Sequence, residues 1–322
     1  MKAIVCSKYG SAEILRVEEM EKPVPKDNQV CIKIYAASLN YGNVALLRGK
    51  PFPVRFVYGL QKPKYAIPGG DIAGIVEAVG PRVTQFKIGD EVFGDLSGCG
   101  WGGFAEYVCA PETAVVHKPI NISFEEAAAT PMAAVTALQA LRDKANIREG
   151  QKILIYGASG GVGTFAAQIA RALGGEVTAV CSTRNVAILQ SFSIEHIIDY
   201  KKEDIKQHLH KYDVILGVNG SQPLSIYRRA LHDRGVFVCI GGSGMQLLKV
   251  ITIGPLLSIG GKKKVTSFLH KPSREDLEVI KGFLEEGQIK PVIERCYPLD
   301  KIAEAFTYFE QGHAQGKIII TV

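Results

Sequence analysis

Long apolar runs are absent from this sequence. No stretch of its 322 residues approaches the run of about 18 apolar residues that a transmembrane helix needs. The apolar run near the N-terminus, Ala3 to Cys6, follows Lys2 and is too short for a signal peptide. We therefore expect a cytoplasmic protein that has no contact with a membrane.

Cysteine and histidine patterns typical of disulfide frameworks or metal sites are also missing. The seven cysteines are odd in number and scattered, and nine residues separate even the closest two, Cys99 and Cys109. No Cys-x-x-Cys spacing occurs, so we expect buried thiols. The seven histidines are dispersed, and His208 with His210 lies on a charged stretch typical of a solvated face.

Charge of one sign is in only small excess. The formal net charge of +6 is compatible with anionic ligands but is far from the basic patches of nucleic-acid-binding proteins. With 47% hydrophobic residues, the chain can bury roughly three quarters of its unfolded surface, which excludes disorder. The length favours two domains.

The first 121 residues are rich in short β-prone runs that glycine, proline and aspartate separate. This rhythm predicts a small β-barrel. The predicted strands are Ala3–Cys6, Val30–Ile34, Ile72–Val79, Glu91–Phe93 and Phe104–Cys109.

A different pattern begins at Ser123, which forms a capping box with Glu126 and starts helical sequence that runs through Arg142 with a break at Pro131. Strand and helix patterns then alternate to about residue 269, which predicts a parallel, doubly wound α/β sheet. Its predicted strands are Lys152–Tyr156, Glu176–Cys181, His196–Asp199, Val214–Val218, Val236–Ile240 and Val265–Phe268. The predicted tail contains a helix at Ser273–Glu286, a strand at Val292–Cys296, a helix from Lys301 and a strand at Lys317–Val322.

The stretch from Lys152 to Gly174 combines a strand, a glycine-rich turn and an amphipathic helix. The turn has the dinucleotide fingerprint with alanine in the first position, as Ala158-x-Gly160-x-x-Gly163. Gly160 would let the backbone approach a pyrophosphate, and Gly163 would let helix and strand pack closely. A second strand follows, so we favour nucleotide binding over a purely structural turn.

Several further motifs accompany the fingerprint. They are Gly69-Gly-Asp-Ile-Ala-Gly74, Val76-Glu-Ala-Val-Gly80, Gly89-Asp-Glu-Val92, Gly103-Phe-Ala-Glu-Tyr107 and Gly312-His-Ala-Gln-Gly-Lys317. With them the sequence resembles the medium-chain dehydrogenase/reductase superfamily, and within it the zinc-free quinone oxidoreductases. The resemblance implies an α/β protein with a GroES-like β-barrel catalytic domain, residues 1–123 and 270–322, and a Rossmann domain, residues 124–269. It also implies a homodimer that reduces quinones or α,β-unsaturated carbonyl compounds with NADPH.

Two catalytic zinc ligands of the related alcohol dehydrogenases are replaced here. Asn40 stands at the position of the cysteine, and Gly70 stands at the position of the histidine in the Gly-His-Glu motif. The cysteine-rich structural lobe is missing as well, since Cys99 stands alone between Val92 and Phe104. We therefore expect no metal site, and a zinc alcohol dehydrogenase is the less favoured alternative.

The end of the second predicted strand bears on the choice of cofactor. NAD-specific sites carry an acidic residue there, whereas this strand ends in Cys181-Ser182-Thr183-Arg184. Hydroxyls and a guanidinium suit a 2′-phosphate, so we expect NADPH, the alternative being that Arg184 is an ordinary surface charge. Tyr200 and Asn219 match family positions beside the adenosine phosphate and the nicotinamide. The full set of predicted cofactor-binding residues is Asn40, Thr136, Ala158, Ser159, Gly160, Gly161, Val162, Gly163, Ser182, Thr183, Arg184, Tyr200, Asn219, Gly241, Gly242, Phe268 and Lys317.

The family usually has Asn-x-x-Asp where this sequence has Asn40-Tyr41-Gly42-Asn43. The departure at Asn43 leaves Asn40 and Tyr41 as the predicted catalytic hydrogen-bonding groups, against the alternative of a turn residue and a packed aromatic. The basic, aromatic segment Arg48 to Tyr65 is predicted to be a loop, either a lid over the substrate or a solvated loop without that role. Lys317 is predicted to reach the active site or else to form a surface salt bridge.

Two other classes of protein share parts of this pattern. Short-chain dehydrogenases also have glycines with the spacing of positions 157, 161 and 163, and a pair with the spacing of Tyr297-x-x-x-Lys301. That tyrosine and lysine must share one face of a helix, but Pro298 directly follows the tyrosine. Short-chain dehydrogenases also begin with the glycine fingerprint, whereas here about 150 residues precede it. The other class is a non-catalytic NADPH-binding protein, such as a redox sensor or a stress protein, which the sequence leaves open.

Overall fold

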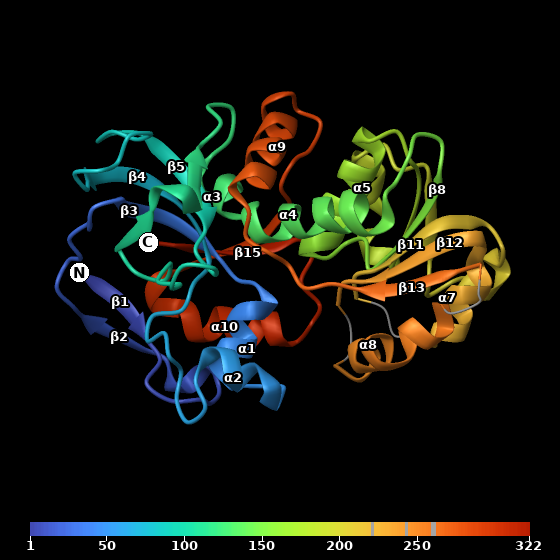
Figure 1. The fold of residues 1–322 in the computed structure, drawn as a ribbon, viewed down its shortest axis with the longest axis horizontal. Helices are drawn as coiled ribbons and strands as arrows, with labels where there is room; N and C mark the ends of the chain where they lie inside the picture. The colour runs from blue at the N-terminus through green and yellow to red at the C-terminus, as the bar shows by residue number, and fades with distance from the viewer. Residues whose placement is uncertain (220–221, 242–243, 259–261) are drawn as a thin grey trace. The chain divides into compact units, whose positions relative to one another are not determined.

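A computed structural model describes residues 1–219, 222–241, 244–258 and 262–322 of the chain. The chain divides into two compact units (Figure 1). The first contains Met1–Val135, Lys271–Glu286 and Pro291–Val322, and the second contains Thr136–His270 and Gly287–Lys290. Within the described ranges, no helix combines the length and the apolar character needed to cross a bilayer.

The first unit is built on a mixed sheet. Its pairing order is β14-β15-β3-β4-β5-β7, with β6 also paired to β3. A separate antiparallel pair joins β1 and β2. In the described part of the chain this order has two ends, and closure into a barrel stays a prediction. The strands are β1 (Lys2–Val5), β2 (Arg16–Glu19), β3 (Gln29–Ser38), β4 (Asp71–Val79), β5 (Glu91–Asp95), β6 (Tyr107–Pro111), β7 (Val115–His117), β14 (Ile293–Pro298) and β15 (Lys317–Thr321).

The long strand β3 organises this sheet because it pairs with β4, β6 and β15. Val30, Ile32 and Ile34 alternate along it and enter the apolar core, as the period of two in a strand requires. Phe104 and Phe306 meet edge to face in the same core, with ring centroids 6.1 Å apart. The strand ends at Ser38, and this places Asn40 two residues beyond the sheet.

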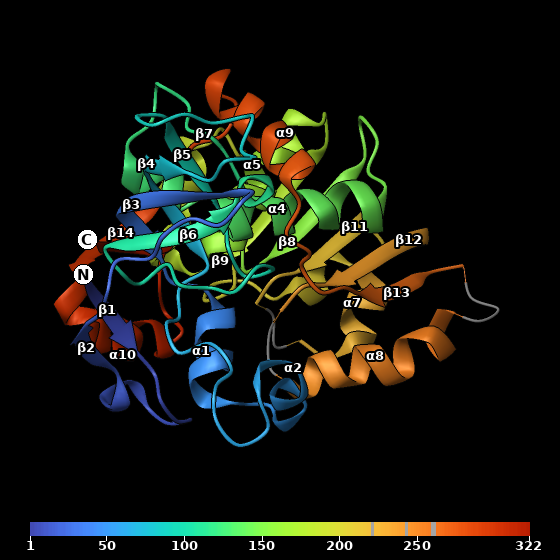
Figure 2. The ribbon, with the colours of Figure 1, turned by 60° about the vertical axis from the view of Figure 1, so that its left-hand side comes forward.

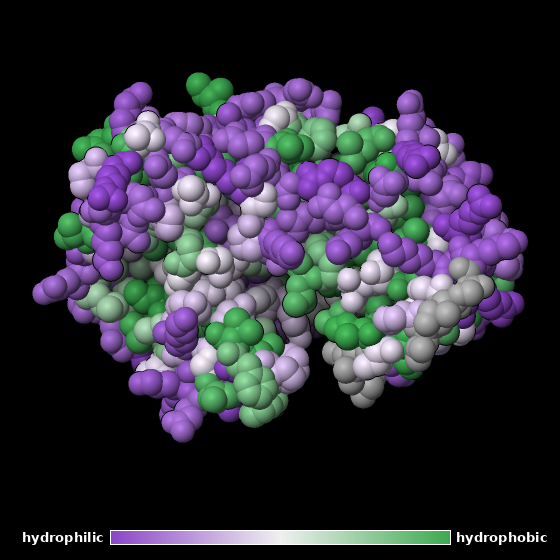
Figure 3. Space-filling view, viewed as in Figure 1, coloured by the Kyte–Doolittle hydropathy of each residue, from purple (hydrophilic) through white to green (hydrophobic). Residues whose placement is uncertain are grey.

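Short helices connect the strands of this unit. The segment from Arg48 to Tyr65, predicted to be a loop, contains the last residue of α1 and two helical turns, so that prediction was partly wrong. Four of its apolar side chains are exposed, and apolar surface gathers over α2 in Figure 3: Phe52, Phe56, Val57 and Leu60. The helical segments are η1 (Ala12–Ile14), α1 (Tyr41–Arg48), η2 (Phe52–Val54), α2 (Arg55–Tyr58), η3 (Glu112–Ala114), α3 (Phe124–Ala128), α9 (Arg274–Glu285), η7 (Leu299–Lys301) and α10 (Ile302–Glu310), while α4 (Pro131–Gln139) leads to the second unit.

The second unit is a six-stranded, fully parallel sheet in the order β10-β9-β8-β11-β12-β13. Helix α5 lies on one face of it, and α7 and α8 lie on the other (Figures 1 and 2). The strands are β8 (Lys152–Tyr156), β9 (Glu176–Cys181), β10 (His196–Asp199), β11 (Tyr212–Gly217), β12 (Leu231–Cys239) and β13 (Lys264–Ser267). The helical segments are η4 (Ala140–Ala145), α5 (Gly161–Ala172), η5 (Thr183–Asn185), α6 (Val186–Ser191), η6 (Ile205–His208), α7 (Leu224–Ala230) and α8 (Gly244–Ser258).

The strand order of this sheet reverses between β8 and β11. From β8 the chain proceeds outward through β9 and β10, and it then returns to the other side of β8 to form β11, β12 and β13. In open parallel sheets ligands bind beyond the carboxyl ends of the strands at such a reversal. The strand order thus predicts a binding site at one edge of this unit.

Candidate active site

The glycine-rich turn follows β8 at the point where the strand order reverses. Gly157 has φ of +87°, which favours glycine, and a Cβ there would lie 2.8 Å from the amide nitrogen of Asn219. At Gly163 a Cβ would collide with the carbonyl oxygen of Gly157 and lie 2.8 Å from the Cα of Ala158. These two glycines allow the turn, the helix and the neighbouring strand to pack closely.

Gly160 has a different environment. A Cβ there would have only the Gly157 carbonyl oxygen nearby, at 3.8 Å. Gly160 is the N-cap of α5 and has no side chain to accept from the first N–H groups of that helix. The turn therefore presents bare backbone at a helix N-terminus, which is what a pyrophosphate requires.

Predicted cofactor residues follow five more strands of the same sheet. Because all six strands are parallel, the residues after their carboxyl ends lie along one edge. The predicted residues placed there are Ser182, Thr183 and Arg184 after β9, Tyr200 after β10, Asn219 after β11, Gly241 after β12 and Phe268 after β13. The remaining fingerprint residues are Ser159, Gly161 and Val162, which are half-buried. Thr136 is buried in α4, and Gly242 lies outside the described residues.

The end of β9 is tied both to the turn and to β10. Asn185 donates from Nδ2 to Ser159 Oγ at 2.7 Å, while its own Oδ1 is buried without a described partner. Thr183 donates from Oγ1 to Asp199 Oδ2 at 2.6 Å, and this bond holds the pKa of the Asp199 carboxyl below its usual range. The hydroxyl proton of Thr183 is thus directed to Asp199, a partner that sequence reasoning missed. Arg184 is exposed.

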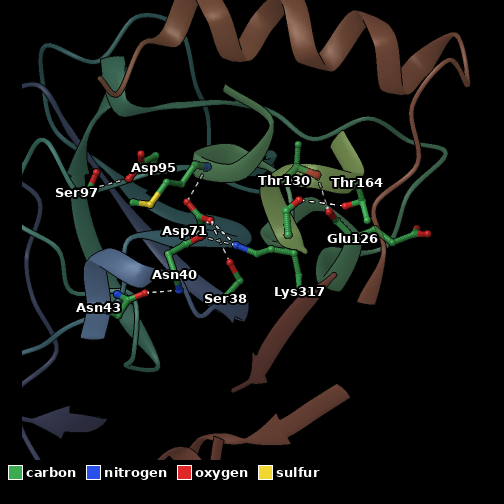
Figure 4. A network of polar contacts seen from close by, with 12 residues as sticks. Ser38, Asn40, Asn43, Asp71, Asp95, Ser97, Glu126, Thr130, Thr164 and Lys317 are labelled. Carbon is green, nitrogen blue, oxygen red and sulfur yellow. Dashed lines mark hydrogen bonds and ion pairs between the residues drawn. The ribbon is translucent and has the colours of Figure 1, made fainter. Parts of the chain in front are cut away.

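In the first unit, a buried polar network surrounds Asp71, the first residue of β4 (Figure 4). Asp71 Oδ2 accepts from Asn40 Nδ2 at 2.8 Å and from Ser38 Oγ at 3.0 Å. Lys317 Nζ donates to Asn40 Oδ1 at 2.6 Å and lies 3.4 Å from Asp71 Oδ2. Asp71 Oδ1 accepts from the backbone N–H of Met132 at 3.0 Å.

The network joins residues far apart in the sequence because three strands meet there. In the antiparallel register Ser38 lies opposite Asp71 on β4 and opposite Ile319 on β15, the strand that begins at Lys317. Lys317 is 3% exposed and Asp71 is fully buried. The predicted alternative of a surface salt bridge for Lys317 was therefore wrong, because the lysine pairs inside the protein.

Burial and pairing act in opposite directions on these two charges. Burial raises the pKa of the Asp71 carboxyl, while Lys317 pulls it back down. Burial lowers the pKa of the Lys317 ammonium, while Asp71 pulls it back up. Each charge is stable inside the protein only because the other, with its hydrogen bonds, is present.

Asn40 and Tyr41 have different surroundings. Asn40 is the N-cap of α1, and its backbone N–H donates to Asn43 Oδ1 at 2.7 Å. Asn43 is fully buried and keeps its Nδ2 without a described partner. Tyr41 is the first residue of α1 and is 68% exposed, so the alternative of a packed aromatic was wrong. The catalytic roles of Asn40 and Tyr41 stay predictions.

The surroundings of Gly70 bear on metal binding. A Cβ there would lie 3.3 Å from Trp101, 3.4 Å from Asp95 and 3.5 Å from Met132, so a histidine would displace its neighbours. Among the residues that the structure describes, no three histidine, cysteine, aspartate or glutamate side chains gather as a metal-ligand group. In the polar network the Asp71 carboxylate is already paired with the Lys317 ammonium and accepts hydrogen bonds from Asn40 and Ser38.

Asp71 and Ser38 were not predicted as site residues. An aspartate that begins an otherwise apolar strand, within Gly-Gly-Asp-Ile-Ala-Gly, is the signal that would have indicated Asp71. Acidic residues are rarely buried without a partner, and Lys317 is the charged partner that this network gives Asp71.

Comparisons with known proteins agree with this architecture. The alcohol dehydrogenase GroES-like domain matches residues 26–120, and the domain described as zinc-binding dehydrogenase matches residues 192–320. The chloroplast envelope quinone oxidoreductase homolog of Arabidopsis thaliana is 35% identical over 99% of this chain and 98% of its own. The chain belongs to the medium-chain dehydrogenase/reductase family.

Other members of this family are similarly close. The 2-methylene-furan-3-one reductase of Solanum lycopersicum is 35% identical over 99% of this chain and 79% of its own length. The solved structure of the quinone oxidoreductase from Coxiella burnetii has a TM-score of 0.86 and 28% identity, covering 100% of this chain and 99% of that one. The resemblance found in the sequence is thus confirmed, and the family is NAD(P)-dependent.

Proposed function

We propose that this protein is a zinc-independent, NADPH-dependent reductase that transfers hydride to quinones or α,β-unsaturated carbonyl compounds. The single observation that carries the proposal is the bare, glycine-lined helix N-terminus at the strand-order reversal of the second unit. The names of two relatives, a quinone oxidoreductase homolog and a furanone reductase, support both acceptor classes.

The second unit would hold NADPH along the carboxyl edge of its sheet. The N–H groups at the start of α5 would bind the pyrophosphate, and Ser182 with Arg184 would bind the 2′-phosphate. When bound, NADPH supplies the hydride and its two electrons. The buried Oδ1 of Asn185, beside Ser159, is an acceptor that a bound ligand could satisfy.

A carboxylate near the 2′-phosphate would ordinarily oppose NADPH. Asp199 ends β10 beside β9, but its two oxygens accept from Thr183 Oγ1 and from the backbone N–H of Lys201, at 2.6 Å and 3.0 Å. Lys202 Nζ lies 3.8 Å from the same carboxylate. We infer that Asp199 positions Thr183 and that the cationic groups nearby favour the phosphate.

In the first unit, Asn40 and Lys317 would act on the acceptor. Reduction of a conjugated carbonyl places negative charge on its oxygen, and a preorganised donor or cation stabilises that charge. Lys317 Nζ donates to Asn40 Oδ1 at 2.6 Å and Asp71 offsets its charge, so Lys317 would orient the Asn40 amide with no need for a metal. Tyr41, whose side chain is largely exposed, would contact the acceptor directly.

The homodimer and the cytoplasmic location expected from the sequence remain part of the proposal. The relatives include proteins named as chloroplastic and mitochondrial, so the family occupies several compartments. Sedimentation analysis and localisation of a tagged full-length chain would test the two expectations.

The test of function is NADPH oxidation with a panel of quinones and enones, with NADH in parallel. We expect acceptor-dependent oxidation that is faster with NADPH. Tight NADPH binding without turnover of any acceptor would instead support the non-catalytic, redox-sensing alternative. Equal activity with NADH would contradict the assignment of Ser182 and Arg184.

A further inference from the structure

Two cysteines face each other across neighbouring strands of the first unit. Cys31 on β3 lies directly opposite Cys109 on β6 in the antiparallel register. In the same register Ile34 lies opposite Glu106, and Ile34 donates its backbone N–H to the Glu106 carbonyl at 2.9 Å. Since bonded and non-bonded pairs alternate along such a ladder, Cys31 and Cys109 form a non-hydrogen-bonded pair.

The spacing of such a pair is compatible with a disulfide. Directly opposite residues in non-hydrogen-bonded pairs have Cα atoms about 4.5 Å apart, and disulfides span Cα separations of about 4.4 to 6.8 Å. Both thiols are free in this structure. No change of strand register is needed for the two sulfurs to bond.

The pair lies on the face of the sheet that is turned away from the apolar core. The residues before and after each cysteine, such as Val30, Ile32 and Val108, enter the core, so the cysteines point the other way. Cys31 is buried beneath the chain at Pro23, whose carbonyl lies 3.6 Å from its sulfur. Cys109 is half-buried, and this gives a small oxidant access to the pair.

The surroundings favour one thiolate within the pair. The hydrogen bond from Cys109, with the nearby charge of Lys22, lowers the pKa of the Cys31 thiol, although burial and the charge of Glu77 oppose this. The same hydrogen bond raises the pKa of Cys109. Lys22 is held in place by Glu77 at 2.6 Å and by the ring of Tyr107, whose centroid is 4.2 Å from Nζ. The thiolate is the form of cysteine that reacts with oxidants.

We propose that Cys31 and Cys109 form a redox-active dithiol that peroxide converts to an intramolecular disulfide. The thiolate attacks one peroxide oxygen, so that an S–O bond forms, the O–O bond breaks and the released hydroxide takes up a proton to become water. The second sulfur then displaces hydroxide from the sulfenic acid, and the S–S bond forms. Two thiols lose two electrons and two protons in all, and hydrogen peroxide becomes two waters.

This site is separate from the proposed active site. Ser38 lies seven residue steps along β3 from Cys31, which at about 3.3 Å per residue is roughly 23 Å. The inference therefore does not depend on the identity of the hydride acceptor.

The test is differential thiol labelling of the full-length protein before and after treatment with hydrogen peroxide. Free thiols are alkylated first, disulfides are then reduced, and the new thiols receive a heavier label before mass spectrometry. We expect both Cys31 and Cys109 to carry the second, heavier label after peroxide treatment. Unreduced digests should contain one cross-linked peptide, lighter by two hydrogens than its two parts, and dithiothreitol should remove it.

Two variants are the controls. In C109S the cross-linked peptide that contains Cys31 should be absent, whereas in C296S, which replaces an exposed cysteine, the Cys31–Cys109 link should form as in the parent. Oxidation of the exposed Cys99 and Cys296 while Cys31 and Cys109 remain alkylatable would overturn the proposal. Linkage of Cys31 to any other cysteine would overturn it too. The labelling of the parent protein decides the question even if C109S fails to fold.

Discussion

The buried pair of Lys317 and Asp71 shows how single residues stabilise each other inside this protein. Neither charge reaches water, and both are bonded to Asn40. Removal of one member of a buried pair leaves the other uncompensated, which typically costs about 3 to 5 kcal/mol. Removal of both members by neutral residues of similar size is often far less costly.

Lys317→Met should therefore be more destabilising than the double variant Asp71→Asn/Lys317→Met. Urea unfolding of the single and double variants at neutral pH would measure this. We expect the single variant to lose about 3 to 5 kcal/mol and the double variant to recover part of that loss. A double variant as unstable as the sum of both single variants would show that the pair is not coupled.

The pH dependence of Lys317→Met follows from the direction of the Asp71 pKa. Burial raises this pKa, and without the lysine nothing in the pair opposes the rise. Above its unfolded-state pKa, Asp71 then binds its proton more tightly in the folded protein than in the unfolded chain. The folded state therefore loses stability as pH rises from the unfolded-state pKa of Asp71 to its higher folded-state pKa. The deficit of Lys317→Met relative to the parent should thus shrink in acid and grow toward neutral pH. A deficit that stays constant with pH would mean that the carboxylate charge is not its cause.

Arg184 is the residue whose loss should separate the two nicotinamide cofactors. A charge-assisted hydrogen bond contributes about 1.5 to 3 kcal/mol, so Arg184→Ala should weaken NADPH binding by roughly 10- to 150-fold and leave NADH binding nearly unchanged. Fluorescence titration with both cofactors would measure this. Equal losses for NADPH and NADH would assign Arg184 a structural role.

At the scale of elements, the β8–α5 turn contains two glycines that differ in the space available for a side chain. Gly160 has open space where a Cβ would go, whereas a Cβ at Gly163 would collide with the Gly157 carbonyl. Gly160→Val should therefore fold normally and lose NADPH binding, because its side chain would occupy the space for the pyrophosphate.

The matched control for this prediction is Gly163→Ala, which should lose stability because its methyl group would overlap the backbone of Gly157 and Ala158. Thermal unfolding and NADPH titration of both variants separate the two effects. A folded Gly160→Val protein that binds NADPH like the parent would contradict our placement of the cofactor.

The elements that sequence patterns predicted best are those whose neighbours are also close in sequence. Strands β8, β9 and β10 begin and end where predicted, because buried parallel strands are short apolar runs with clear limits.

The helix that begins at Tyr41 was missed, since Asn40 and Asn43 cap it through a pattern that also resembles a turn. The network around Asp71 could not be predicted, because it depends on the register of β3, β4 and β15, which lie far apart in the chain.

At the scale of the whole molecule, we predict independence from metal, which would distinguish this protein from the zinc alcohol dehydrogenases. The ammonium of Lys317 stands beside Asn40, and little space surrounds Gly70. Dialysis against a chelator should therefore leave NADPH-dependent reduction unchanged. Stoichiometric zinc in the purified protein, with activity lost on chelation and restored by zinc, would refute this.

The central claim is direct hydride transfer from NADPH to a quinone or an enone. It is tested most directly with NADPH deuterated at either the pro-R or the pro-S hydrogen of the nicotinamide, by mass analysis of the NADP⁺ formed. A rigidly held cofactor presents one face to the acceptor. We therefore predict that one deuterated cofactor transfers its deuterium and yields NADP⁺ without the label. The other should transfer hydrogen and yield NADP⁺ that keeps its single deuterium. The same mixture from both cofactors, or no NADP⁺ with any quinone or enone, would contradict the account.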